Sequence, residues 1–321
     1  MRYIDVANGD ADGLCALHQL RLAEPADAEL VTGVKRDIAL VERVRAAPGD
    51  LVTVLDVSLE RNRAAVEHLL AAGVRVRYFD HHHAGEIPRH AGLEAHIETR
   101  GGTCTAVLVD ALLAGRFRAW AVTAAFGDNL GALGRRLAAP LRLREDQLEA
   151  LGELGEAINY NAYGETIADL RVAPAELYRL MRPYADPFGF LAREAVFEEL
   201  FNGWREDMNR ALAVAPQVES DAGAVYELPD EPWSRRVTGA FANHLAVTHP
   251  ARAHAVLAPN SRGGYIVSVR APQGSARSAD GLAREYPTGG GRQEAAGVDD
   301  LPEHELPGFL LRFEEYFGAR G

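Results

Sequence analysis

The stretch Val76–Gly85 reads VRYFDHHHAG, and the change of residue type within it indicates the kind of fold. The apolar run that ends at Phe79 predicts a buried strand. Asp80 and three histidines follow at the point where this strand ends. A histidine run alone is also typical of a solvated loop, so the choice between such a loop and a metal or acid–base centre depends on the rest of the chain.

The first ~130 residues alternate between strand and helix patterns. Helical spacing lies between the strand-like runs, at 14–22, 38–44 and 61–70. Strand–helix alternation of this kind predicts right-handed crossovers and a parallel sheet with flanking helices, which is an α/β fold. The apolar runs that predict its strands are 2–7, 29–34, 51–57 and 74–79.

The later part of the chain has a different pattern. Charged helical segments are clearest at 145–159 and 191–215, and three prolines in 216–236 indicate a nearby domain boundary. The remaining segments predict a smaller α/β domain: helices at 234–247, 279–284 and 306–317, and strands at 254–258 and 265–270. We therefore expect three parts: a first domain at 1–190, a helical connector and linker at 191–232, and a second domain at 233–321.

The bulk composition limits the classes of function. Of the 321 residues, 47% are hydrophobic and 25% are charged, as in soluble globular proteins. The net charge of −12 argues against a general nucleic-acid surface, although not against a local basic groove, and it suits a site that gathers divalent cations. No apolar run reaches the ~18 residues of a membrane span, and no signal peptide pattern is visible, so a cytoplasmic location without a membrane partner is expected.

The chemically rich residues follow the predicted strands. Asn8, Asp10 and Asp12 come after the first strand, Asp56 comes after the third, and Asp80 with the histidines comes after the fourth. A Gly-Asp pair at Asp128 ends a later helical stretch. Because the carboxyl ends of parallel strands form the ligand crevice of an open sheet, we expect these segments to meet in one place.

Carboxylates and imidazoles in one crevice are the ligands of hard or borderline divalent metals such as manganese. Two such ions ~3.5–4 Å apart, bridged by one carboxylate, suit an in-line displacement at phosphorus. A nearby histidine could give a proton to the leaving oxygen. Each motif alone is weak, since a lone DxD pair is often a turn and Asp56 could cap the helix at 60. The four together favour a metal centre.

Four short runs resemble the motifs of the DHH phosphoesterase superfamily: NGDADG at 8–13, LDVS at 55–58, DHHH at 80–83 and FGDN at 126–129. The run GGGRQEAAG at 289–297 resembles the glycine-rich signature of the accessory DHHA1 domain. The resemblance extends over both halves of the chain. It implies a RecJ- or nanoRNase-like hydrolase, with a parallel-sheet DHH domain followed by a smaller α/β DHHA1-like domain that binds substrate.

The resemblance also implies a role for each matched residue. It implies two divalent ions, usually manganese, with magnesium as an alternative. Asp56 would bridge them, and His82 would contact the scissile phosphate or act as general acid. Asp80 would orient the histidines, while the role of His83 stays open among the catalytic candidates. The other expected metal ligands are Asp12, His81 and Asp128 for one ion, and Asp10 for the second ion.

Two positions depart from the pattern of the family. Asn8 stands where RecJ-like members have an aspartate, and Val6 stands where many others have a histidine. Since Asn8 offers only a neutral oxygen, we expect the second ion to bind less tightly than the first. Arg292 stands where the glycine-rich signature usually has a histidine, and arginine would still hold a phosphate through two hydrogen bonds.

Further candidate contacts for a phosphorylated substrate are basic or glycine-rich. Lys35 and Arg36 follow a predicted strand, so we expect them at the same sheet edge, with a charged turn as the alternative. Thr103 and Thr105 precede a helix and are interpreted as capping residues first. The remaining candidates, in the second domain, are Arg270, Gly289, Gly290 and Gly291.

The motifs and the resemblance therefore predict a two-metal-dependent phosphoesterase that hydrolyses a phosphodiester of a short oligonucleotide or a nucleotide. Its partner would be a small phosphorylated substrate or a short single-stranded nucleic acid, and a homodimer is left open. One alternative is a polyphosphate or phosphoanhydride hydrolase. Another is a nucleotide-binding regulatory protein with weak catalysis, which the departures at Asn8 and Arg292 would allow.

Overall fold

A computed structural model describes residues 1–318 of the chain. These residues belong to two compact units, Met1–Asn202 and Gly203–Gly321. The domain boundaries expected at 190 and 232 stay a prediction, and the last three residues of the expected second domain lie outside the described residues. Each unit is treated by itself below.

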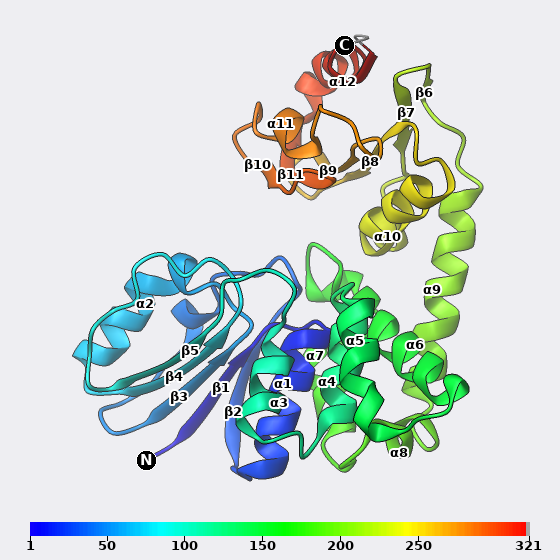
Figure 1. Cartoon of the computed structure of the whole chain (residues 1–321). Helices are drawn as coiled ribbons and strands as arrows, with labels where there is room; N and C mark the ends of the chain where they lie inside the picture. Colours follow the sequence, from blue (N-terminus) through cyan, green and yellow to red (C-terminus); the bar gives the residue numbers. More distant parts are fainter. Residues whose placement is uncertain (319–321) are drawn as a thin grey trace. The chain divides into compact units, whose positions relative to one another are not determined.

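The first unit contains a five-stranded sheet in which all neighbouring strands run parallel, in the order β2-β1-β3-β4-β5 (Figure 1). This confirms the parallel α/β fold expected from the strand–helix alternation. The edge strand β5 was not predicted, because its charged and exposed residues lack an apolar run. The strands are β1 (Tyr3–Ala7), β2 (Ala28–Thr32), β3 (Leu51–Leu55), β4 (Arg75–Asp80) and β5 (Leu93–Ile97).

Helices surround this sheet on both faces (Figure 1). The helix expected at 38–44 is only a four-residue 3-10 turn, and that expected at 191–215 is a shorter helix which starts at 196. The helices are α1 (Ala11–Ala23), α2 (Leu59–Ala71), α3 (Thr105–Leu112), α4 (Arg118–Gly127), α5 (Gly131–Ala138), α6 (Glu145–Ala162), α7 (Pro174–Met181), α8 (Pro187–Leu191) and α9 (Val196–Leu212), with 3-10 turns η1 (Leu40–Arg43), η2 (Ala139–Leu141) and η3 (Ile167–Asp169).

Successive residues of the central strands pack into two different cores. Leu55 and Phe79 face a core that α1, α3, α4 and α6 complete, whereas Val54 and Tyr78 face a core that includes Val66 of α2. This follows from the two-residue repeat of a strand, whose side chains alternate between the faces of the sheet. Because both faces are covered, the edge formed by the carboxyl ends of the strands is left for ligands.

The strand order also fixes where a ligand site is expected. From β1 the chain crosses to β2 on one side, and it then returns to form β3 on the other side of β1. This reversal lies between β1 and β3, and open parallel sheets bind ligands at the carboxyl ends of the strands around such a point. Residues directly after β1 and β3 therefore border the expected crevice.

Two glycines allow the turn from β1 to α1 to be tight. A side chain at Gly9 would place its Cβ 2.1 Å from the carbonyl oxygen of Gly33, and one at Gly13 would lie 2.3 Å from that of Asn8. Only a residue without a side chain fits such close approaches. The approach at Gly9 brings the segment after β2 against the segment after β1.

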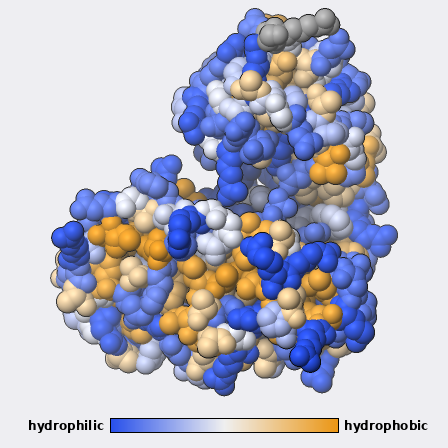
Figure 2. Space-filling view, viewed as in Figure 1, coloured by the Kyte–Doolittle hydropathy of each residue, from blue (hydrophilic) through white to orange (hydrophobic). Residues whose placement is uncertain are grey.

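The second unit contains a six-stranded mixed sheet in the order β10-β11-β9-β8-β7-β6. The two strands expected at 254–258 and 265–270 are present, and four further strands were not predicted. On the face shown in Figure 2, hydrophilic side chains cover most of this unit. Its elements are β6 (Val218–Glu219), β7 (Gly223–Glu227), α10 (Pro232–Thr248), β8 (Ala253–Pro259), β9 (Gly264–Arg270), α11 (Ala279–Ala283), β10 (Gly289–Gly291), β11 (Ala295–Pro302), η4 (Glu303–Glu305) and α12 (Leu306–Gly318).

Within residues 1–318, no helix combines the length and the apolar character needed to cross a membrane. Both cysteines, Cys15 and Cys104, are buried free thiols.

His18 is a buried titratable group in the core of the first unit. It is 1% exposed, its Nε2 lies 2.8 Å from the carbonyl oxygen of Tyr184, and its ring packs edge-on against Trp120. Burial lowers the pKa of His18 to about 4. The folded chain therefore holds this ring neutral at a pH where an unfolded chain would protonate it.

We expect this histidine to weaken the fold in mild acid. Below its ordinary pKa of 6.5 the unfolded state binds a proton that the folded state refuses until about pH 4, so stability falls as the pH falls through this window. The contribution at pH 5 is roughly 2 kcal/mol. Urea unfolding of the wild type and of His18→Gln at pH 7.5 and pH 5 measures it. The variant should lose less stability between the two pH values, and equal losses would contradict this account.

Candidate metal centre

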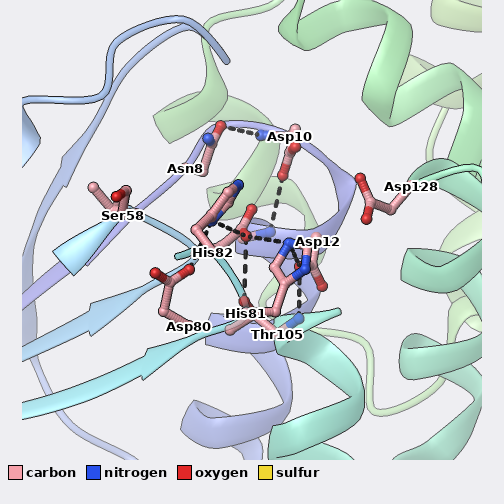
Figure 3. A network of polar contacts seen from close by, with 12 residues as sticks. Asn8, Asp10, Asp12, Ser58, Asp80, His81, His82, Thr105 and Asp128 are labelled. Atoms are coloured by element: carbon pink, nitrogen blue, oxygen red, sulfur yellow. Dashed lines mark hydrogen bonds and ion pairs between the residues drawn. The ribbon is translucent and has the colours of Figure 1, made fainter. Parts of the chain in front are cut away.

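The four sequence motifs meet at the carboxyl edge of the first sheet. Asn8, Asp10 and Asp12 come from the turn after β1 and the start of α1, the histidines follow β4, and Asp128 is the residue at the end of α4 (Figure 3). Most of these side chains are buried, Asp10, Asp12 and Asp56 being at most 2% exposed. The convergence expected from strand ends in the sequence is therefore present in the structure.

Asp56, His81 and His82 form the centre of this cluster, and Asp12 lies beside them. His81 Nε2 lies 3.5 Å from Asp56 Oδ1 and 3.8 Å from Asp12 Oδ2. Asp56, His81 and His82 each offer a ligand atom within 4.8 Å of the others. Donor atoms around one divalent ion with bonds near 2.1 Å lie ~3 Å apart, so a small closure of this cluster would suit a cation.

Asp56 has an unusual backbone conformation. Its φ of 59° lies in the left-handed region, which residues other than glycine seldom adopt. Its amide follows β3 and donates to the carbonyl oxygen of Phe79, while Thr105 Oγ1 donates to Asp56 Oδ1 at 3.2 Å. Strain of this kind is found where the surrounding structure holds a functional side chain in place.

Asp12 links the first motif to α3. The backbone N–H groups of Thr105 and Ala106 donate to its two carboxylate oxygens, each at 2.7 Å. Asp12 thus caps the start of a helix 93 residues away, where the aligned backbone dipoles favour a negative charge. Cys104 is the residue before that helix and gives no side-chain cap, so capping by Thr103 or Thr105, as first interpreted, is wrong.

The three histidines have different surroundings. His81 is turned toward the carboxylates, whereas His82 Nδ1 lies 2.7 Å from Asp80 Oδ1. Asp80 is fully buried, so its contact fixes the orientation of the half-exposed His82 ring. His83 is 77% exposed and lies 3.3 Å from Glu60. The structure therefore brings Asp80, His81 and His82 to the centre but does not bring His83 there.

Lys35 lies inside the cluster, beside the first motif. Its ammonium donates to Asp10 Oδ2 at 2.6 Å and to Asn159 Oδ1 at 3.1 Å, and it lies 3.7 Å from Asp128 Oδ1. The adjacent Arg36 lies in the wall of an open cleft with Arg43 and other residues. The sequence placed Lys35 at the correct edge of the sheet, but its direct partner is a carboxylate of the centre.

Asn8 is used for local contacts. Its Oδ1 accepts from the backbone N–H of Asp10 at 3.3 Å, and its Nδ2 donates to the carbonyl oxygen of Lys35 at 3.4 Å. The carboxamide therefore ties the turn after β1 to the segment after β2. As a metal ligand it stays a prediction.

The close packing of charge shifts the pKa values of the metal-free cluster. Burial, helped by the neighbouring Asp56, raises the pKa of Asp12 to about 7. Burial also raises the pKa of Asp128 to about 6, against the opposing charge of Lys35. Burial alone would lower the pKa of His81, but Asp56 and Asp12 raise it to about 9. The cluster thus holds protons that a bound cation would displace.

Lys35 and Asp10 form a pair with the opposite behaviour. Burial would raise the pKa of Asp10, but the charge and the hydrogen bond of Lys35 hold it below its ordinary value. Burial would also lower the pKa of Lys35, but Asp10, Tyr163 and Asp128 keep it well above its ordinary value. Both groups are therefore ionised at neutral pH.

The donor set fits a divalent metal. Asp12, Asp56, His81 and Asp128 provide three carboxylates and one imidazole, the ligand types that suit manganese. Asp56 and His81 lie within reach of one ion, and Asp12 lies beside them with lone pairs that its backbone donors leave available.

Arg270 and Arg292 of the second unit both neighbour Ala295, which pairs with Arg270 in the sheet and accepts a hydrogen bond from the backbone N–H of Arg292. Arg270 Nε donates to Asn243 Oδ1 at 2.8 Å, so this guanidinium is tied to α10. Gly289, Gly290 and Gly291 form β10, and Arg292 is exposed directly after it. No neighbour within 4 Å would meet a Cβ at Gly290, so its backbone is open to a ligand. Their role in substrate binding stays a prediction.

The sequence did not predict the contact of Asn159 with Lys35 or the hydrogen bond that Thr105 donates to Asp56. Asn159 lies within the helical pattern that predicts α6, and nothing in that pattern marks it as a partner of a lysine 124 residues earlier. Thr105 follows a Gly-Gly pair, which indicated a loop before a helix but not a contact to Asp56.

The sequence matches no protein-family model, and no curated protein matches it either. Solved structures do match. One is an exonuclease RecJ bound to manganese, with a TM-score of 0.66 and 19% identity, over 100% of this chain and 91% of that chain. Another is RecJ in complex with Mn²⁺ from Thermus thermophilus, with a TM-score of 0.69 and 21% identity, where this chain covers only 52% of the other.

Two smaller proteins match along nearly their whole length. The pGpG-specific phosphodiesterase PggH from Vibrio cholerae has a TM-score of 0.55 and 14% identity, with both chains covered completely. An exopolyphosphatase-related protein from Bacteroides fragilis has a TM-score of 0.51 and 15% identity, with 99% of this chain and 93% of that chain covered. The chain therefore shares its fold with RecJ, with this phosphodiesterase and with the exopolyphosphatase-related protein, which confirms the fold expected from the resemblance of its motifs.

Proposed function

We propose that the protein is a metal-dependent phosphoesterase that hydrolyses a phosphodiester of a short oligonucleotide or a nucleotide. The observation that carries this proposal is the convergence of Asp12, Asp56, His81 and Asp128 at the carboxyl edge of the sheet. The solved structures of the same fold support it, because they include an exonuclease and a dinucleotide phosphodiesterase.

A divalent ion held by these residues would polarise a phosphoryl oxygen and make a bound water acidic enough to attack phosphorus. The residues of the chain have separate tasks. Asp12 and Asp56 are fixed by backbone and hydroxyl donors, so they would hold the ion in a set position. His82 is oriented by Asp80 through Nδ1, which leaves Nε2 to contact the phosphate or protonate the leaving oxygen.

The raised pKa of His82 suits this second task. Burial would lower it, but the hydrogen bond to Asp80 and the charge of Asp56 raise it above the ordinary value. His82 therefore holds its proton more tightly than a free imidazole does, and the protonated form is the one that gives a proton to a leaving oxygen.

The main alternative is hydrolysis of polyphosphate or another phosphoanhydride. The exopolyphosphatase-related protein of similar fold supports it, and the metal centre itself would serve either substrate. A nucleotide-binding regulatory protein is the other alternative. An enzyme is favoured because the expected carboxylates and histidines are all present: Asp10, Asp12, Asp56, Asp128, His81 and His82. Turnover of a dinucleotide, a cyclic dinucleotide and polyphosphate with manganese, measured side by side, separates these functions.

We expect metal binding to depend on pH. A cation must displace protons from His81 and Asp12, whose pKa values are about 9 and about 7, so the apparent affinity for Mn²⁺ should rise with pH between 6 and 8. Each proton released would contribute about tenfold per pH unit. Isothermal titration in buffers of different ionisation enthalpy counts these protons. An affinity that is the same at both ends of this range would contradict the assigned ligands.

His82→Gln should separate proton donation from metal binding. We expect kcat on a dinucleotide to fall by roughly 10²–10⁴, the usual contribution of a general acid, while the bound manganese is retained. His90→Gln, in an exposed loop, is the matched control. Asp56→Ala should instead lose both metal and turnover. If His82→Gln kept full kcat, the proton would have to come from another group.

Arg292→Ala tests the substrate contact of the second unit. A charge-assisted hydrogen bond to phosphate is worth about 1.5–3 kcal/mol, so KM for a dinucleotide should rise roughly tenfold to a hundredfold. If Arg292 binds a phosphate other than the scissile one, turnover of bis-p-nitrophenyl phosphate, which has only the scissile phosphate, should change much less than that of a 5′-phosphorylated dinucleotide. Arg284→Ala, directly after α11, is the control, since its guanidinium pairs locally with Asp280. An unchanged KM would remove Arg292 from the site.

A further inference from the structure

Lys35 raises a question that the proposed phosphoesterase leaves open, namely how many ions the centre holds. Its ammonium has three oxygen neighbours, on Asp10, Asn159 and Asp128, at 2.6, 3.1 and 3.7 Å. An ammonium has three N–H donors and a compact charge. These three oxygens therefore surround the Lys35 ammonium as they would surround a small metal cation. A second divalent ion held by Asp10 would need the same space beside that carboxylate.

The backbone around Lys35 is anchored on two sides. Its N–H donates to the carbonyl oxygen of Ala162 at 2.9 Å, and its own carbonyl oxygen accepts from Asn8 Nδ2 at 3.4 Å. The ammonium also lies 5.5 Å from the centre of the Tyr163 ring. The lysine is therefore held toward Asp10 by both the turn after β1 and the end of α6.

The choice of residue type is a second, independent observation. The chain contains 34 lysines and arginines, and Lys35 is its only lysine. All other lysine or arginine positions are arginine, and the single ammonium side chain lies beside Asp10. The planar guanidinium of arginine would spread its charge over a fork that is wider than the site of a single ion.

The donors on the side of Asp10 are poor for a divalent ion. Asn8 Oδ1 already accepts one hydrogen bond from the backbone N–H of Asp10, and it carries no net charge, so it is a weaker ligand than a carboxylate. Four carboxylates, on Asp10, Asp12, Asp56 and Asp128, face the centre. One divalent ion together with Lys35 leaves one unbalanced negative charge, and two ions together with Lys35 leave one unbalanced positive charge.

We propose that the Lys35 ammonium takes the place of a second divalent cation beside Asp10, so that the centre holds one metal ion on the side of Asp12, Asp56, His81 and Asp128. This inference rests on the proposed metal-dependent function. It also gives Lys35 a chemical task, because its ammonium would neutralise Asp10 and offer an N–H to a phosphate oxygen. An ammonium carries no coordinated water, so the attacking water belongs to the side of His81.

The number of ions bound at saturation tests the proposal directly. We expect manganese analysis after equilibrium dialysis to give one ion per chain, with the electron paramagnetic resonance spectrum of an isolated Mn²⁺. In Lys35→Met, which keeps the length and removes the charge, two ions per chain and a spin-coupled pair are expected. Arg89→Met, in an exposed loop, is the control and should stay at one.

Two ions per chain in the wild type, or one ion in a folded Lys35→Met, would overturn the proposal. Circular dichroism and retention of the first ion show whether that variant is folded, and Lys35→Gln repeats the test with a shorter polar side chain. These counts do not depend on turnover. A protein with one ion and no phosphoesterase activity would refute the proposed function alone, whereas an active protein with two ions would refute only the role of Lys35.

Discussion

The burial of several carboxylates in one place is the constraint on which the rest of the site depends. Asp10, Asp12 and Asp56 are at most 2% exposed, and water cannot screen their mutual repulsion. Removing charge from water is costly unless partners of opposite charge or hydrogen-bond donors replace the solvent. The parallel sheet creates this problem by ending several strands at one edge, and the neighbouring elements must solve it.

Each carboxylate has its own solution. The start of α3 provides Asp12 with two backbone donors, Thr105 provides Asp56 with a hydroxyl, and Lys35 provides Asp10 with a full positive charge. The raised pKa values of Asp12, about 7, and of Asp128, about 6, show that the neighbouring groups compensate these two carboxylates only in part. The cluster is thus partly neutralised by the chain itself and is completed by a cation. The backbone donors at the start of α3 therefore help to fix Asp12 of the first motif, although α3 is far away in sequence.

The sequence predicted the features that depend on local residue patterns, and it missed those that depend on contacts between distant segments. The central strands were predictable because apolar runs report burial on both faces, and the site was predictable because strand ends share one edge. The edge strand β5 and the strands β6 and β7 were not predictable, since they lack apolar runs or lie in a segment rich in prolines. The capping of α3 by Asp12 and the contact of Lys35 with Asn159 join segments 93 and 124 residues apart, and no local pattern encodes such pairs.

Asn8 and Lys35 are best interpreted together, because they contact each other and both lie beside Asp10. Asn8 alone indicates a weaker ligand for an ion, and Lys35 alone indicates an anion contact at a sheet edge. The structure joins them, because the amide of Asn8 donates to the backbone of Lys35 and both lie beside Asp10. A carboxylate at position 8 would draw in a second cation, whereas a neutral amide leaves Asp10 with one negative charge for one ammonium to balance. Under the proposed role of Lys35, these two residues together would replace part of the charge balance made by ions with one made by the chain.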